Sequence, residues 1–62
     1  MMNTVEDARR SIRQALEGGP YAHNVASAAL RWVAGKYGRK KANGLVREFK
    51  LAEAFGICEE PE

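Results

Sequence analysis

The chain has 62 residues, a net charge of +2 and a single cysteine. This length allows one domain with a thin core, and one cysteine excludes an internal disulfide framework. No apolar run approaches the roughly 18–20 residues that a membrane-spanning helix needs. Residues Met1 to Glu6 are polar and no apolar stretch follows them, so we expect no signal peptide, no membrane partner and a cytoplasmic location.

A first helix is predicted to begin near Asn3 or Thr4 and to stop at Gly18-Gly19-Pro20. Asn3 followed by Glu6 favours a capping box, and Thr4 followed by Asp7 is a weaker version one residue later. Apolar residues then recur at helical spacing, at Val5, Ala8, Ile12, Ala15 and Leu16. The other side of this helix carries Arg9, Arg10, Arg13 and Gln14. Acidic residues are interleaved there, so we expect a solvated face.

A second helix is predicted from about Tyr21 or Asn24 to Tyr37, with Pro20 at its first position or Asn24 as its cap. It is apolar on most of its circumference, which is typical of a buried helix. We therefore expect it to be the central element, with Trp32 in the core. Gly38 should separate it from a third helix.

The third helix has the clearest amphipathic pattern, with apolar residues at i, i+3, i+4 and i+7: Ala42, Leu45, Val46 and Phe49. A short turn from Ala52 to Phe55 should end at Gly56, with Ile57 packing back on the core. The predicted fold is all-α, a compact three-helix bundle with a short C-terminal helical turn. Residues 1–57 form the single helical domain, and residues 58–62 are expected to be a loose acidic tail.

A basic cluster marks the junction of the second and third helices. Arg39, Lys40 and Lys41 lie in a first helical turn, where cations oppose the helix dipole. A local rule broken without local gain can mark a site. The candidate partner-binding residues are Lys36, Tyr37, Arg39, Lys40, Asn43 and Arg47. A solvated basic corner is the alternative interpretation of the same residues.

The same two helices partly match a helix-turn-helix motif. Ala34 and Gly38 have the right mutual spacing, but Gly44 and Arg39 occupy positions that are usually apolar. A recognition helix would present Arg39, Asn43 and neighbouring cations to base edges, and Arg and Asn read guanine and adenine. So small a module would also need to dimerise on DNA for useful affinity.

No set of residues suggests catalysis. His23 and Cys58 are the only His and Cys in the chain, whereas a zinc site needs about four N or S ligands. No nucleophile is paired with a base, and no glycine-rich loop could bind phosphate. We expect no cofactor, no metal and no enzymatic activity.

The leading hypothesis is a small protein-binding module that acts as a regulator, inhibitor or adaptor on a larger protein partner. An accessory role in a phage or mobile element is suggested by size alone. One alternative is a nucleic-acid-binding protein that uses the basic helix. Another is a structural homo-oligomer such as a homodimer, because the apolar surface is large for so short a chain.

Overall fold

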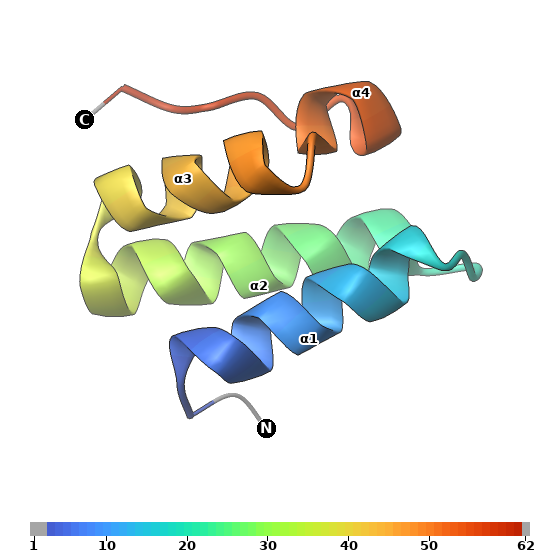
Figure 1. The fold of residues 1–62 in the computed structure, drawn as a ribbon, viewed down its shortest axis with the longest axis horizontal. Coiled ribbons are helices and arrows are strands. Elements are labelled where there is room, and N and C mark those ends of the chain that lie inside the picture. Colours follow the sequence, from blue (N-terminus) through green and yellow to red (C-terminus); the bar gives the residue numbers. More distant parts are fainter. Residues whose placement is uncertain (1–2, 62) are drawn as a thin grey trace.

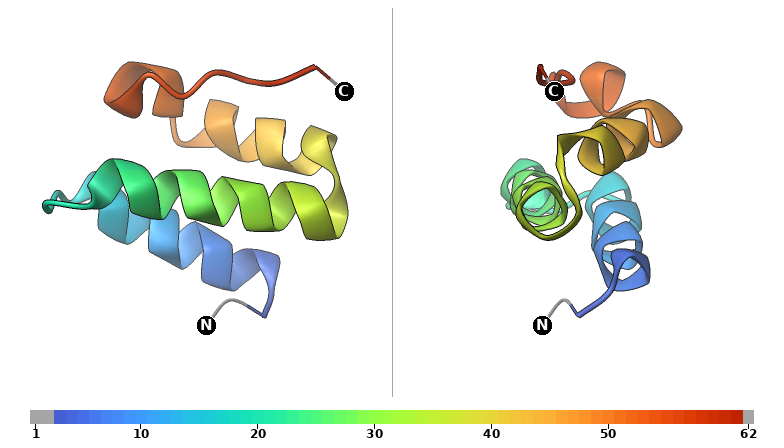
Figure 2. Two further views of the ribbon diagram at one scale, coloured as in Figure 1. Left: turned by 180° about the vertical axis from the view of Figure 1, so that it is seen from behind. Right: turned by 90° about the vertical axis from the view of Figure 1, so that its left-hand side faces the viewer.

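The computed structural model describes residues 3–61 and contains four helices in that range. They are α1 (Val5–Leu16), α2 (Ala22–Tyr37), α3 (Arg39–Glu48) and α4 (Leu51–Phe55). Helix α2 packs against both α1 and α3, and the chain leaves α4 to run back beside α3 (Figure 1). The end-on view in Figure 2 shows α1, α2 and α3 at the corners of a triangle. The predicted all-α three-helix bundle with a short C-terminal turn is confirmed.

Helix α1 is capped by Thr4 and not by Asn3. The Thr4 Oγ1 accepts a hydrogen bond from the Asp7 backbone N–H at 3.2 Å, and the Asp7 carboxylate accepts one from the Asn3 N–H at 3.1 Å. The preferred Asn3–Glu6 capping box was therefore wrong, and the second choice is the one that forms. Glu6 is engaged elsewhere, because its carboxylate lies 3.0 Å from the Arg13 guanidinium.

Two glycines reverse the chain between α1 and α2. Gly18 and Gly19 have φ angles of 109° and 130°, which side-chain-bearing residues rarely adopt. Helix α2 then begins at Ala22, and Tyr21 precedes it without a side-chain cap. This start lies within one residue of the predicted start at Tyr21, but neither of the proposed arrangements, Pro20 at the first helical position or Asn24 as the cap, forms.

Gly38 separates α2 from α3, as predicted. Its φ of 98° and ψ of 161° end one helix and start the next within a single residue. The two helices consequently pack against each other as antiparallel neighbours.

The core is small and lies between α2 and its two neighbours. Helix α2 contributes Ala29, Leu30 and Val33, to which Trp32 adds a partly buried ring. The outer side of α2 is open, since Val25 is 40% exposed. The other core members are Ala8, Ile12, Ala42, Leu45, Val46 and Leu51, with Phe49, Phe55 and Ile57 packed at the margin. The prediction that α2 is buried is thus correct for the faces that pack against α1 and α3, and wrong for its outer face.

A left-handed residue that the sequence did not reveal separates α3 from α4. Lys50 has a φ of 53° and a ψ of 47°, a conformation that costs a non-glycine residue roughly 1–2 kcal/mol. Gly56, with a φ of 72°, ends α4, and the Ile57 N–H donates to the Leu51 carbonyl. Ile57 packs against the core as expected, and this contact directs the following residues along α3.

Within residues 3–61, the structure has no helix whose length and apolar content would let it cross a membrane. The predicted cytoplasmic location stays a prediction.

Candidate docking surface on helix α3

The structure divides the six predicted binding residues into two groups. Residues Arg39, Asn43 and Arg47 follow one another at i, i+4 and i+8, so they share one face of α3. This row contacts the C-terminal segment 58–61, which we call the tail. The remaining three, Lys36, Tyr37 and Lys40, are exposed at the end of the molecule where α2 meets α3. We call them the tip.

Asn43 holds the tail by its backbone. Its Nδ2 donates to the Glu60 carbonyl at 2.7 Å, and its Oδ1 accepts from the Glu60 N–H at 2.9 Å. A side-chain amide can pair in this way with one residue of extended chain, because it offers both a donor and an acceptor. Asn43 is only 5% exposed, and it is the one polar residue found buried within residues 3–61. Its hydrogen-bonding capacity is therefore directed to the tail.

Two arginines complete the row. The Arg39 guanidinium donates to the Pro61 carbonyl at 3.1 Å, and the Arg47 guanidinium lies 2.8 Å from the Glu59 carboxylate. The Arg47 and Glu59 side chains are 61% and 40% exposed, so the pair contributes only about 0–1 kcal/mol to stability. The Asn43 clamp fixes the tail's position, whereas Arg47 favours an acidic residue beside it.

The tail was predicted to be loose. In the structure it is hydrogen-bonded to α3 through Glu59, Glu60 and Pro61. A typical intramolecular hydrogen bond contributes about 1 kcal/mol net, so this attachment is weak compared with folding of the core. How freely the tail detaches is a dynamic property, and its looseness stays a prediction.

A groove of about 420 Å³ lies between α2, α3 and the tail. Its apolar lining comes from Leu30, Ala34, Ala42, Val46 and Ile57, and its polar lining includes Arg31, Arg39, Asn43, Glu59 and Glu60. Volumes of about 300–1,000 Å³ are typical of ligand sites. The tail thus occupies one side of the groove between α2 and α3 and leaves about 420 Å³ beside it unfilled.

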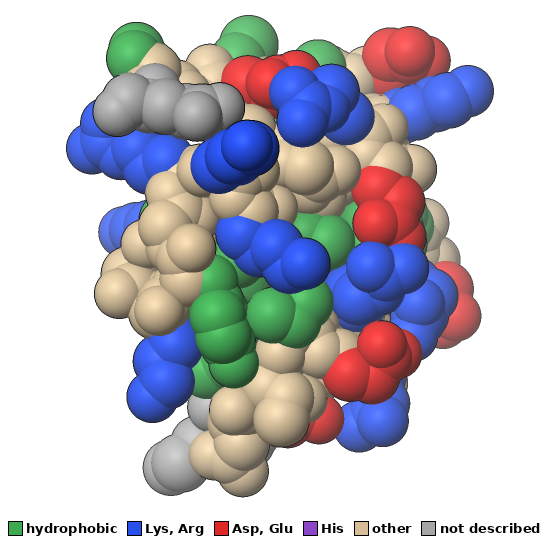
Figure 3. Space-filling view, turned by 60° about the vertical axis from the view of Figure 1, so that its left-hand side comes forward, with side chains coloured by type: hydrophobic (Ala, Val, Ile, Leu, Met, Phe, Trp, Pro, Cys, Tyr) green, Lys and Arg blue, Asp and Glu red, His purple; other side chains and the backbone are tan. Residues whose placement is uncertain are grey.

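The tip combines an aromatic pair with cations. The Tyr37 ring is 47% exposed and meets the Trp32 ring edge-on, with centroids 5.9 Å apart. Lys36 and Lys40, on either side of Tyr37 in the sequence, are also exposed. On the face that includes this end of the molecule, Figure 3 shows exposed hydrophobic side chains with lysines and arginines around them. Aromatic rings are enriched in protein interfaces, which favours Tyr37 as a contact residue.

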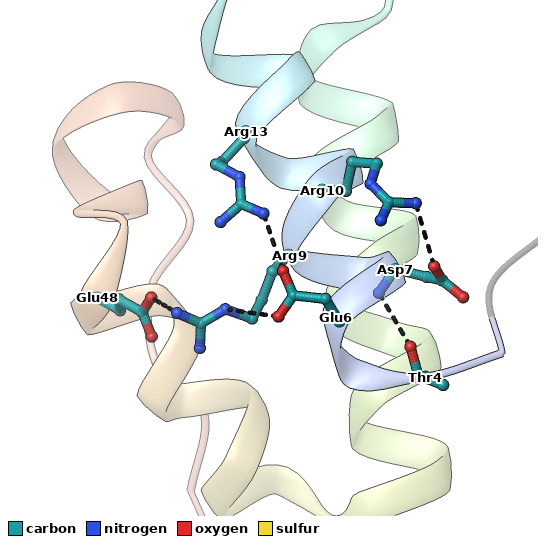
Figure 4. Close-up of polar contacts among 7 residues, drawn as sticks. All are labelled: Thr4, Glu6, Asp7, Arg9, Arg10, Arg13 and Glu48. Carbon is teal, nitrogen blue, oxygen red and sulfur yellow. Dashed lines mark hydrogen bonds and ion pairs between the residues drawn. The ribbon is translucent and has the colours of Figure 1, made fainter.

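The arginines of α1 are neutralised by carboxylates of this chain. Arg9 bonds to Glu48 of α3, and its guanidinium lies 5.8 Å from the centre of the Phe49 ring. Arg10 lies 3.4 Å from Asp7 (Figure 4). The hydrogen bond from the Asn3 N–H, assisted by Arg10 and Thr4, holds the pKa of Asp7 below its usual 3.8 despite some desolvation. The α1 face is thus a solvated ion-pair network, as expected.

The reactive side chains are scattered. His, Cys, Asp and Glu form no group of three that could hold a metal among residues 3–61. His23 packs edge-on against Phe55, with ring centroids 6.1 Å apart, and Cys58 is exposed at the groove. Comparisons with protein-family models, with curated proteins and with solved structures found no match for this chain.

Sequence reasoning missed the tail as part of this surface. Its one available signal was charge, since the acidic run at residues 59–60 could be matched to Arg39 and Arg47. The Asn43 clamp left no such signal, because the register of the tail on α3 depends on the turn at Gly56 and the packing of Ile57.

Proposed function

We propose that this protein is a non-enzymatic protein-binding module that docks on a larger protein through the tip. The observation that carries the proposal is the half-exposed Tyr37 ring, which packs edge-on against Trp32 and lies in the sequence between the exposed residues Lys36 and Lys40. An aromatic anchor that is already held by a second ring loses little side-chain entropy on binding. Tyrosine is also among the residue types that contribute most of the binding energy in many interfaces.

The rest of the charged surface supports the same assignment. The α1 arginines are paired with Glu6, Asp7 and Glu48, so they attract an acidic partner less than the tip does. Rim cations of this kind act mainly on association rate and partner choice. A finer role as inhibitor, regulator or viral accessory protein rests on size alone.

The proposal is tested by affinity capture from host lysate with a tip variant, Lys36→Glu/Tyr37→Ala/Lys40→Glu. A matched control, Arg10→Glu/Lys50→Glu, makes the same change in charge away from the tip. We expect wild type and control to capture the same protein, with and without nuclease, and the tip variant to lose it while retaining its helical circular dichroism. Equal capture by all three would contradict docking through the tip.

Nucleic-acid binding is the second candidate, and the exposed lysines of the tip favour it. Against base-specific recognition, Asn43 is buried and its amide is engaged by the tail, so it is not free to read adenine. A salt titration separates the candidates. Phosphate binding predicts that log affinity falls with log salt concentration by about 0.9 per contact, and absence of binding at low salt would remove this candidate.

A further inference from the structure

The tail shows what kind of segment the groove accepts. It runs antiparallel to α3 in an extended conformation, as Figures 1 and 2 show from opposite sides. The clamp formed by Asn43 contacts only the backbone of Glu60, so it accepts any extended residue with a free N–H. Arg47 adds a preference for an acidic side chain one residue earlier. These contacts select an extended acidic peptide.

Asn43 is 5% exposed while the tail is bound to it. When the tail leaves, both bonds of the Asn43 amide to Glu60 are lost. If the tail moved away, the group that best replaces it is another stretch of extended chain, which offers a carbonyl and an N–H at the same spacing. Water could satisfy the two atoms of the amide, but it would leave the neighbouring apolar surface uncovered.

The tail is an incomplete occupant. Beside it, the groove retains about 420 Å³ with Leu30, Ala34 and Val46 along its apolar side. Cys58, whose side chain is short, lines this space together with Arg31 and Arg39. A segment with a large apolar residue at the place of Cys58 would bury more surface than the tail does.

We propose that the groove between α2 and α3 binds an extended acidic segment of a protein partner, and that the tail is an intramolecular occupant that this segment displaces. The inference rests on the proposed function, because it identifies the chemistry of the partner. The tail is tethered directly to α4, so it competes at an effective concentration in the millimolar range. A free peptide should therefore bind wild type weakly and bind tightly once the tail is disabled.

The test uses the full chain with the double substitution Glu59→Arg/Glu60→Pro. The first change removes the carboxylate that pairs with Arg47, and the second removes the N–H that donates to Asn43. Both lie outside the helices, so they leave the core intact. The probe is a fluorescein-labelled peptide, Ile-Ser-Glu-Glu-Pro, which repeats residues 57–61 with serine in place of the cysteine. A second probe has leucine at that place.

Fluorescence polarisation should show the tail variant binding the serine peptide at least tenfold more tightly than wild type does. The leucine peptide should bind more tightly still, and a peptide with lysine in place of the first glutamate should bind several-fold more weakly, because the lysine would lie beside Arg47. Adding Asn43→Ala and Arg47→Glu to the tail variant should abolish binding. Equal affinity of wild type and tail variant, or no binding to the tail variant, would overturn the proposal.

A second copy of this chain could also occupy the groove. Sedimentation of wild type and of the tail variant over a range of concentrations tests this. We expect monomers throughout. A wild-type dimer that dissociates when the tail is substituted would assign the groove to a second copy and overturn the proposal. The peptide assay needs no captured partner, so the two proposals can fail separately. If the tip variant loses its captured protein but the tail variant binds no peptide, only the assignment of the tip is supported. If the tail variant binds the peptide but no protein is captured, only the assignment of the groove is supported.

Discussion

A single side chain, Asn43, fixes the position of the tail on α3 through two hydrogen bonds to the Glu60 backbone. Asparagine is a poor helix former and is rarely buried without a partner, yet it is 5% exposed in the middle of α3. Its two bonds to Glu60 offset the cost of that burial. The presence of a buried asparagine inside α3 is therefore explained by its bonds to the tail, and not by the helix that contains it.

Replacing Asn43 with alanine should separate tail attachment from folding. Alanine removes both bonds to Glu60 but improves helix propensity, so the free energy of unfolding should change by less than about 1 kcal/mol. The Glu60 amide, in contrast, should exchange with solvent at the rate of an unstructured peptide. Hydrogen exchange by NMR and denaturant unfolding measure the two effects, with Arg47→Ala as the control that keeps the clamp. A loss of several kcal/mol would instead place Asn43 in the folding core.

Lys50 stores local strain that glycine would relieve. Its left-handed backbone costs roughly 1–2 kcal/mol, and glycine removes this cost while adding about 0.5–1 kcal/mol of chain entropy to the unfolded state. Lys50→Gly should therefore raise the free energy of unfolding by about 0.5–1 kcal/mol. The control Ala28→Gly, at an exposed position inside α2, should lower it by about 1 kcal/mol. Destabilisation by both variants to a similar degree would contradict the backbone geometry at Lys50.

At the scale of the elements, Asp7 at the N-terminus of α1 makes the free energy of unfolding depend on pH. The Asp7 pKa lies below 3.8 in the folded protein, first because its carboxylate accepts from the Asn3 N–H and then because Arg10 and Thr4 stabilise its charge. Because the Asp7 pKa is lower in the folded than in the unfolded protein, its charge stabilises the fold at pH values above the unfolded-state pKa. This stabilisation is lost as the pH falls through the folded-state pKa and the carboxylate is protonated. Wild type should thus exceed Asp7→Asn in unfolding free energy at pH 6, and the difference should shrink below pH 3.8. Thermal unfolding at several pH values measures it, and a difference that grows in acid would be the opposite of the expected sign.

The elements that could be predicted from the sequence are those with local signals. The glycines at 18–19, 38 and 56 mark chain reversals or helix ends, and the amphipathic spacing of α1 and α3 defined the core faces. The cap of α1 was misassigned because Asn3 and Thr4 offer equivalent local chemistry, and the competition of Arg13 for Glu6 is visible only in three dimensions. The break at Lys50 has no local signal, since lysine does not favour a left-handed conformation.

Part of the candidate site could likewise be predicted from the sequence, and part could not. Exposure of Tyr37, Lys36 and Lys40 follows from their place beside a helix-ending glycine, and the structure agrees. The roles of Arg39, Asn43 and Arg47 could not be predicted, because they depend on a segment that returns to α3 from 12 to 22 residues further along the chain.

At the scale of the whole molecule, the core is thin. Eleven hydrophobic residues are buried within residues 3–61, and five of them are alanine, so the few large side chains must supply most of the stability. Each of them should consequently be sensitive to truncation.

Ile12, which is fully buried, gives the sharpest test of this core. Ile12→Ala should lower the free energy of unfolding by about 2–5 kcal/mol, which corresponds to a fall in Tm of roughly 10 °C or more in a domain of this size. Val25→Ala, at a side chain that is 40% exposed, should cost less than about 1 kcal/mol. Calorimetry measures both, and equal effects of the two substitutions would contradict the assignment of inner and outer faces.

The docking surface on α3 depends on the tail lying along this helix in the clamp of Asn43. Nuclear Overhauser contacts between the Asn43 side-chain amide protons and the Glu60 backbone test this directly in the unmodified protein. We predict clear cross-peaks, together with chemical shifts at residues 59–61 that depart from random-coil values. Absent cross-peaks and random-coil chemical shifts from residue 58 onward would contradict it.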